Sequence, residues 1–234
     1  MVPVPFRSLR YCVDDMEALK DALIKCKYAE EANIKLLVTK DETALDNVRK
    51  TLQDYETTLK ANDNIFIAFA GHGISFPSPK DEPDKKDYYF CCSDARVVYS
   101  VFEEGDRFIR QGLLPLSEIN DILDGCQCNS KIIVTDACRN ILQEESLIRS
   151  AGNLEEGVTN SFLKATDLRG VSGDMTERQN DRGFFRIASC SAGEVSHEQE
   201  RLKHGVFTYN LIQGLQGAAD TNGDGKIALL ELVE

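Results

Sequence analysis

A histidine and a cysteine each follow a strongly apolar run in this chain. The run 64–71 leads directly into His72 and Gly73, and the run 131–137 leads directly into Cys138. Both runs have the length and composition of buried strands. In open α/β sheets, ligands bind at the carboxyl ends of the strands, so neighbouring strands would bring this imidazole and this thiol into one cleft. The spacing predicts a nucleophile and its base at that edge.

The chemistry of such a pair is nucleophilic catalysis. A free thiol has a pKa of about 8.5, and an adjacent imidazole can accept its proton and later return it to a leaving amine. If the backbone N–H groups of Gly73 and Cys138 converge, they would stabilise a developing oxyanion by about 3 kcal/mol per donor. Either side chain alone would be interpreted as structural, because free cysteine is commonly buried. The sequence indicates no third side-chain member.

The elements around these residues alternate between β-rich apolar runs and stretches of helical period. This order is typical of an α/β sandwich of three layers, a mostly parallel sheet with helices on both faces. The expected strands are Ile34 to Thr39, Asn64 to Ala70, Asp87 to Cys92, Lys131 to Thr135 and Gly183 to Ser189. The expected helices are Val13 to Cys26, Thr43 to Ala61, Leu116 to Asp124 and Val206 to Ala218. Two polar stretches, Ser75 to Lys86 and Ile141 to Arg182, stand outside this scheme.

Composition and charge restrict the partners. The 234 residues include 27 Lys and Arg against 39 Asp and Glu, a net charge of -12 that repels nucleic acid and anionic membranes and attracts basic peptides. Apolar runs are too short for a membrane helix and no signal stretch opens the chain, so we expect a soluble protein. The eight scattered cysteines predict reduced thiols and a cytoplasmic setting. Their spacing does not predict zinc, and no Gly-rich loop predicts a flavodoxin-like nucleotide site.

The motifs around the two reactive residues resemble those of a known family. Ala70-Gly-His-Gly73 and Asp136-Ala-Cys-Arg139 resemble the His and Cys motifs of the caspase-like cysteine peptidases, most closely the metacaspases and bacterial members. The resemblance extends through Leu9 to Leu19 and Ala188 to Ser196. It implies a single caspase-like peptidase domain over 1–234. It also implies that Cys138 is the nucleophile, His72 the acid and base, and Gly73 an oxyanion donor with the Cys138 amide.

The same resemblance implies a substrate class. Caspases selective for aspartate carry Gln two positions before the nucleophile, whereas this chain has Asp136, the acidic residue that metacaspases use in a pocket for Arg or Lys. Asp15 matches the second pocket acid, with Asp14 as the alternative, and Ser189 is a further substrate-binding residue. Two carboxylates would repel an acidic side chain and pair with a basic one. We therefore expect polypeptide substrates cleaved after Arg or Lys.

Two further segments carry predictions. Residues 141–182 fall where the family carries a processing loop, and the basic cleavage points there are Arg149, Lys164, Arg169 and Arg178; the alternative is a plain surface loop. Residues 220–231 reproduce the spacing of a twelve-residue EF-hand calcium loop, and the alternative is a tight turn into a helix. The predicted calcium ligands are Asp220, Asn222, Asp224, the Lys226 carbonyl and Glu231. A lone loop should bind weakly, toward about 10⁻⁴ M.

The chain also departs from the family pattern. The family normally opens with an apolar strand before the first helix, and no such strand is evident in Met1 to Phe6. Asn140 stands where Gly or Ser-Gly usually follows the nucleophile. These departures leave open an inactive caspase-like scaffold or a calcium-responsive interaction domain as the alternative to a peptidase.

Overall fold

The computed structural model describes residues 2–3, 6, 9–76, 88–99, 108–137, 140–141, 183–189 and 198–232. Its helices are α1 (Cys12–Lys25), α2 (Leu45–Thr58), α3 (Leu116–Gly125) and α6 (Val206–Gln213), with a 3-10 turn at Glu31–Asn33 and a π-helical turn at Gly214–Ala218 after α6. All four expected helices are confirmed. Gly217, at φ 117°, breaks the helical backbone at the end of the last one. No helix in the described part of the chain is long and apolar enough to cross a bilayer.

A parallel sheet forms the centre of the fold. Its strands are β2 (Asn64–Gly71), β6 (Ser130–Ala137) and β8 (Phe184–Ala188), in the order β2-β6-β8. The register pairs Gly71 with Ala137 and Thr135 with Ala188, so the carboxyl ends of all three strands meet at one edge. The expected strands at these places are confirmed, and the two strands that precede His72 and Cys138 are neighbours, the condition under which the sequence predicts a shared cleft.

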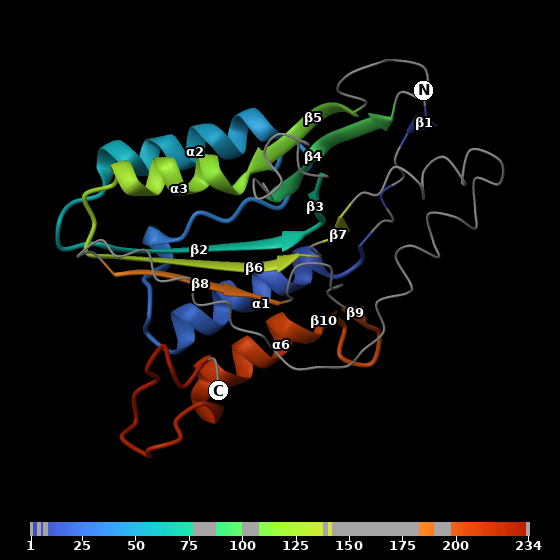
Figure 1. The fold of residues 1–234 in the computed structure, drawn as a ribbon. Coiled ribbons are helices and arrows are strands. Elements are labelled where there is room, and N and C mark those ends of the chain that lie inside the picture. The colour runs from blue at the N-terminus through green and yellow to red at the C-terminus, as the bar shows by residue number, and fades with distance from the viewer. Residues whose placement is uncertain are drawn as a thin grey trace.

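Helices cover both faces of this sheet, as Figure 1 shows with α2 and α3 on one side and α1 and α6 on the other. Consecutive residues of β6 divide between the two faces: Ile133 packs in the cluster with Leu52 and Leu123, and Val134 packs in the cluster with Leu19 and Leu211. This alternation follows from the period of two of a strand, and it explains why a doubly covered strand is apolar throughout. The three-layer α/β prediction is confirmed.

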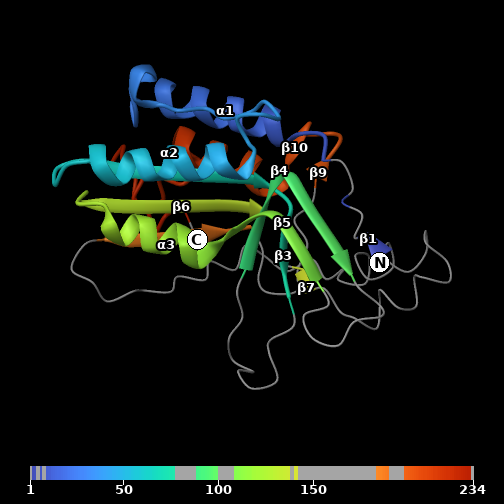
Figure 2. The ribbon, with the colours of Figure 1, turned by 90° about the horizontal axis from the view of Figure 1, so that it is seen from above.

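A second, largely antiparallel sheet adjoins the same edge. It contains β1 (Val2–Pro3), β3 (Gly73–Ser75), β4 (Tyr88–Tyr99), β5 (Phe108–Pro115) and β7 (Asn140–Ile141). The strand expected at Asp87 to Cys92 is thus the first part of a longer strand, β4. A separate pair, β9 (Glu198–Gln199) with β10 (His204–Gly205), leads into α6. Figure 2 shows β9 and β10 beyond the end of β6, close to one end of α1.

The strand expected at Ile34 to Thr39 is wrong, because residues 34–38 have no strand structure. The backbone at both ends of this segment bonds locally instead: the Ile34 N–H donates to the Glu31 carbonyl, and the N–H groups of Val38 and Thr39 donate to the Glu42 carboxylate. Within the described residues β2 pairs with β6 alone, and the short β1 pairs with β4. An apolar β-rich segment becomes a strand only where another strand accepts its hydrogen bonds.

Candidate active site at the carboxyl edge of the sheet

The two sheets place His72 beside the chain that carries the predicted nucleophile. His72 lies between β2 and β3, and Cys138 falls between β6 and β7. These strands pair in parallel on both sides of the junction, Gly71 with Ala137 and Ile74 with Asn140. Cys138 itself lies outside the described residues. Adjacent strands lie about 4.8 Å apart, so the flanking backbone supports the predicted proximity of the two side chains.

The backbone at His72 is held by β4. The Cys91 N–H donates to the His72 carbonyl over 2.8 Å. The next pair of the β3–β4 ladder, Gly73 opposite Phe90, is therefore a pair without hydrogen bonds between its two residues. In an antiparallel ladder the N–H of such a residue is directed away from the partner strand. The Gly73 N–H is therefore directed to the far side of β3 from β4, the side on which β7 lies. The imidazole of His72 packs 5.6 Å from the Phe6 ring, centroid to centroid.

Two buried carboxylates lie at the same edge. Asp136, the penultimate residue of β6, is 7% exposed, and Asp15 in the first turn of α1 is 3% exposed. The neighbouring Asp14 is exposed, so Asp15 is the one of these two residues that reaches the site. The two carboxylates are close together, because an oxygen of each lies within 3.1 Å of the point where a Cβ of Gly205 would stand. The structure thus brings together two of the acids that the sequence assigned to one pocket.

Each carboxylate is held by groups from the segment 204–208. The Asp15 carboxylate accepts from the Gly205 N–H over 3.1 and 3.2 Å, and its Oδ1 lies 2.7 Å from His204 Nδ1. Asp136 Oδ2 accepts from the Thr208 hydroxyl over 2.7 Å and from the Thr208 N–H over 3.3 Å. Thr208 is the third residue of α6, so Asp136 caps the N-terminus of that helix.

Burial and negative charge shape the titration of this site. Burial raises the pKa of Asp15, and the hydrogen bonds from Gly205 and His204 oppose that rise. The Cys12 thiol has its pKa raised to about 12 by burial and by the charges of Glu198, Asp15 and Asp136. Cys12 is therefore a neutral thiol at physiological pH. The site is a region of concentrated negative charge with His204 at its border.

The raised pKa of Asp15 predicts a stabilising substitution. A carboxyl that binds its proton more tightly in the folded state loses folding stability as pH rises through its folded pKa. Asp15→Asn keeps the shape and hydrogen bonds without that loss, so we expect its melting temperature to exceed the wild-type value by a few degrees at pH 7. The gain should vanish below the pKa of the unfolded chain, about 3.9. Melting curves between pH 3 and 8 test this, with Asp14→Asn as the control, and a destabilised Asp15→Asn protein at pH 7 would contradict it.

Gly205 lies against both carboxylates. A Cβ at this position would be 2.7 Å from Asp136 Oδ2 and 3.1 Å from Asp15 Oδ2, although the backbone angles of Gly205, φ -61° and ψ 135°, suit any residue. Glycine is needed here for space and not for backbone freedom. We expect Gly205→Ala to destabilise the fold by about 1–3 kcal/mol, the usual cost of overpacking. Chemical denaturation measures this, and adding Asp136→Ala should recover part of the loss; additive effects of the two substitutions would contradict the contact.

Ser189 follows β8 at the same edge. Its N–H donates to the Thr135 carbonyl over 2.9 Å, which places it beside the last residues of β6. Its hydroxyl oxygen is buried and has no hydrogen-bond partner among the described residues. A buried hydroxyl without a partner is uncommon, because desolvation without a hydrogen bond costs free energy. The structure thus places Ser189 at the same edge of the sheet as Asp136, and its role in binding substrate stays a prediction.

The predicted calcium loop has its carboxylates turned onto its own backbone. Asp220 accepts from the N–H groups of Gly223, Asp224 and Gly225, and Glu231 accepts from the Ala228 N–H. Gly225, the glycine at the sixth position, has φ 76°. Over the described residues, no three His, Cys, Asp or Glu side chains group closely enough to hold a metal ion. In this conformation the predicted ligands therefore do not fit calcium.

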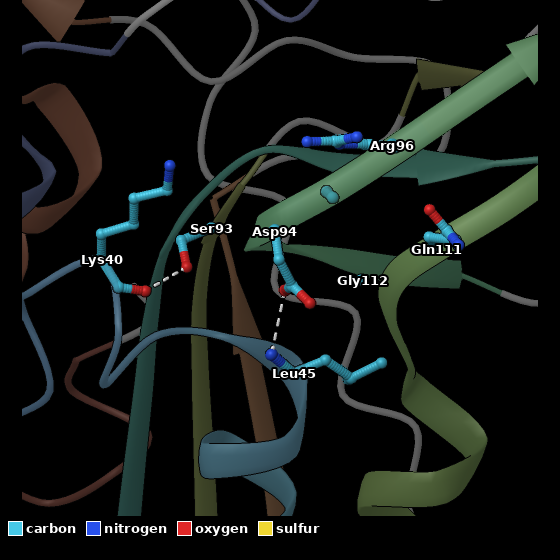
Figure 3. Close-up of a pocket in the computed structure, with 8 residues that line it drawn as sticks. Lys40, Leu45, Ser93, Asp94, Arg96, Gln111 and Gly112 are labelled. Carbon is cyan, nitrogen blue, oxygen red and sulfur yellow. Dashed lines mark hydrogen bonds between the residues drawn. The ribbon is translucent and has the colours of Figure 1, made fainter.

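A cavity of about 560 Å³ lies away from these residues, where α2 begins against an irregularity in the β4–β5 pairing. Figure 3 shows its lining, which includes Lys40, Ser93, Asp94 and Arg96. The Asp94 carboxylate accepts from the Leu45 N–H, and the Ser93 hydroxyl donates to the Lys40 carbonyl. These bonds attach α2 to β4. Neither His72 nor the buried acids line this cavity.

Sequence reasoning missed the residues of the segment 204–208. The sequence predicts no role for His204 or Gly205 and places Thr208 only within a helix, yet these residues contact both pocket acids. The sequence did contain a local signal. His204 and Gly205 directly precede the expected helix, so they place an imidazole, and a glycine that another group can approach closely, at the N-terminus of that helix.

Comparison with known proteins identifies the fold family. The caspase domain family matches residues 5–233. Metacaspase-4 of Arabidopsis thaliana is 28% identical over 187 residues, covering 76% of this chain and 38% of its own. Metacaspase-1B of Aspergillus terreus is 24% identical over 231 residues, covering 94% and 59%. Metacaspase-6 of Arabidopsis thaliana is 31% identical over 97 residues, covering 39% and 26%.

The chain thus spans from about a quarter to three fifths of the length of these curated relatives. Among solved structures, the crystal structure of protein GSU0716 from Geobacter sulfurreducens has a TM-score of 0.54 and 16% identity, covering 89% of this chain and 74% of that one. That likeness concerns the fold alone. The family match extends over nearly all of the sequence and agrees with the doubly covered parallel sheet. This chain therefore belongs to the caspase domain family.

Proposed function

We propose that this chain is a cysteine endopeptidase that cleaves peptide bonds after Arg or Lys. The observation that carries the proposal is the parallel pairing of the strands that end before His72 and Cys138. Membership of the caspase domain family supports the reaction class, and two buried acids at the same edge support the preference for a basic side chain. Metacaspase relatives match most of the chain.

The mechanism follows from these residues. His72 takes the proton of the Cys138 thiol, and the sulfur attacks the carbonyl carbon of the substrate. The N–H groups of Gly73 and Cys138 stabilise the oxyanion of the tetrahedral intermediate. The imidazolium of His72 then gives its proton to the leaving amine as the C–N bond breaks, which leaves a thioester. Water hydrolyses the thioester through His72 and restores the thiol.

The substrate side chain enters between the two acids. Asp15 and Asp136 are both buried, so a guanidinium or ammonium group that reaches them forms charge-assisted hydrogen bonds in a region of reduced dielectric. Ser189 contributes a buried hydroxyl at the same edge. The negative charge of the chain favours the approach of basic peptides in general.

Hydrolysis of two matched fluorogenic peptides, one ending in Arg and one in Asp, tests the proposal. We expect cleavage of the Arg peptide alone, and its loss in Cys138→Ala. Cleavage of the Asp peptide would overturn the role of Asp136. A folded protein that cleaves neither peptide would favour the inactive scaffold. Incubating the wild-type protein and Cys138→Ala without a peptide tests self-processing. The candidate cleavage points are Arg149, Lys164, Arg169 and Arg178, which lie outside the described residues.

We also propose that the loop 220–231 binds calcium weakly once Glu231 releases the Ala228 N–H. Its support is the spacing of the donors and the turn at Gly225. The expected Kd lies at about 10⁻⁴–10⁻³ M, the range of weak single sites. Calorimetric titration of calcium measures it. Loss of the heat in Glu231→Gln would support the site, whereas equal heats in both proteins, or none in either, would overturn it.

A further inference from the structure

One short segment contacts both acids of the proposed substrate pocket. The segment 204–208 lies between β9 and the body of α6, and it places His204 and Gly205 against Asp15 and Thr208 against Asp136. The two acids are 121 positions apart in the sequence and belong to different elements, α1 and β6. Figure 1 shows β10 beside the ends of α1 and α6, at the edge toward which the arrows of β2 and β6 point.

The contact with Asp15 fixes the direction of its carboxylate. His204 Nδ1 lies 2.7 Å from Oδ1, and the Gly205 N–H is shared between the two oxygens. The Asp15 side chain is 4% exposed, whereas the His204 side chain is 23% exposed and lies at the border of the site. An ionised Asp15 accepts the Nδ1–H of this ring, and that bond favours the charged form against the effect of burial.

The β9–β10 pair that carries His204 is itself fastened to α1. Glu198 Oε1 accepts from the N–H groups of Arg10 and Tyr11 at the start of α1, over 2.7 and 2.8 Å. Arg10 also forms an exposed ion pair with Glu200 at 2.8 Å. The position of His204 relative to Asp15 is therefore set by contacts that both strands of the pair make with α1 and the residues just before it.

The contact with Asp136 works through one oxygen. Oδ2 receives both the hydroxyl and the N–H of Thr208, and Thr208 is only 1% exposed. Asp136 lies two residues before Cys138, so the bond to Thr208 also fixes the chain that leads into the nucleophile. A valine at 208 would keep the shape of this side chain and the N–H but remove the hydroxyl donor.

We propose that His204 and Thr208 are positioning residues for basic specificity, His204 by orienting Asp15 and Thr208 by orienting Asp136. The inference rests on the proposed function, because it takes these acids as the site that binds the substrate side chain. Each of these side chains supplies a 2.7 Å hydrogen bond, and a buried carboxylate that loses such a bond more readily binds a proton or turns toward water. In both cases the pocket loses negative charge where the substrate cation must lie.

Binding in the Cys138→Ala background tests this without depending on catalysis. The ligands are two peptides that differ only at the last residue, Arg in one and citrulline in the other, so that a neutral urea replaces the guanidinium. We expect the Arg peptide to bind about tenfold or more tightly than the citrulline peptide, as charge-assisted hydrogen bonds to buried acids require. His204→Leu and Thr208→Val should each reduce this ratio at least threefold, by about the loss of one such bond.

Conservative variants supply the matched controls. His204→Asn retains an N–H near the position of Nδ1, and Thr208→Ser retains the hydroxyl, so both should keep most of the ratio. Because the ratio compares two ligands on one protein, partial unfolding of a variant cancels. In the active enzyme, the Leu and Val variants should raise KM for the Arg peptide more than they change kcat.

Each outcome decides the inference. An unchanged ratio in folded His204→Leu and Thr208→Val overturns it, and so does equal binding of the two peptides by Cys138→Ala itself. A reduced ratio that the Asn and Ser variants restore supports it. If that pattern holds but the protein with Cys138 hydrolyses no peptide, the proposed peptidase activity fails and the positioning roles stand.

Discussion

Replacing His72 with alanine is expected to lower kcat for an Arg peptide by about 10²–10⁴-fold, the usual contribution of a general acid and base. The strand pairing brings His72 beside the segment that leads into Cys138, and in the proposed mechanism the loss of the imidazole leaves the Cys138 thiol without a proton acceptor. KM should change little, since the proposed mechanism assigns His72 to the chemical step and Asp15 and Asp136 to substrate binding. Steady-state kinetics on one fluorogenic peptide separate the two parameters.

The control for this prediction is the other histidine of the site. His204→Asn should leave kcat near the wild-type value, because His204 contacts Asp15 and not the predicted nucleophile. Melting curves of both variants show whether loss of the packing between His72 and Phe6 has affected the fold. A folded His72→Ala protein with kcat within threefold of wild type would remove His72 from the mechanism.

The position of the reactive residues at strand ends was accessible from sequence because it depends on a local property, whereas the pairing of those two strands was only a condition of the prediction. An apolar run with a polar residue at its end predicts both a buried strand and the edge at which it stops. This reasoning placed His72 and Asp136 correctly at strand ends. It also predicted the two covered faces, since β6 is apolar at Ile133 and Val134 alike.

The contacts of the acids were not accessible, because they join distant parts of the chain. Asp15 and His204 are separated by 189 positions, and no local pattern reports that β9 and β10 return to α1. The error at residues 34–39 has a related cause. Local composition there favours a strand, but a strand also needs a neighbour, and the ends of this segment bond to Glu31 and Glu42.

Replacing Asp136 with asparagine is expected to lower kcat/KM for the Arg peptide by about 30-fold or more, because truncating a buried charge pair at a binding site costs about 2–5 kcal/mol. The amide oxygen of Asn can still accept the Thr208 hydroxyl, so the cap of α6 and the fold should persist. Hydrolysis of peptides ending in Arg and in citrulline measures the effect. The citrulline peptide should lose little, so the preference for Arg should nearly disappear.

Asp14→Asn separates a local charge effect from a general one. It removes the same charge from an exposed position next to Asp15, so it makes the net charge of the protein less negative without changing the pocket. If long-range attraction of basic peptides were the main source of specificity, Asp14→Asn and Asp136→Asn would weaken Arg cleavage to a similar degree, and 0.5 M salt would abolish the preference. A buried pair is screened much less, so the wild-type preference for Arg should largely survive in that salt while Asp136→Asn lacks it in any buffer. Equal effects of the two substitutions would move the specificity from the pocket to the surface of the molecule.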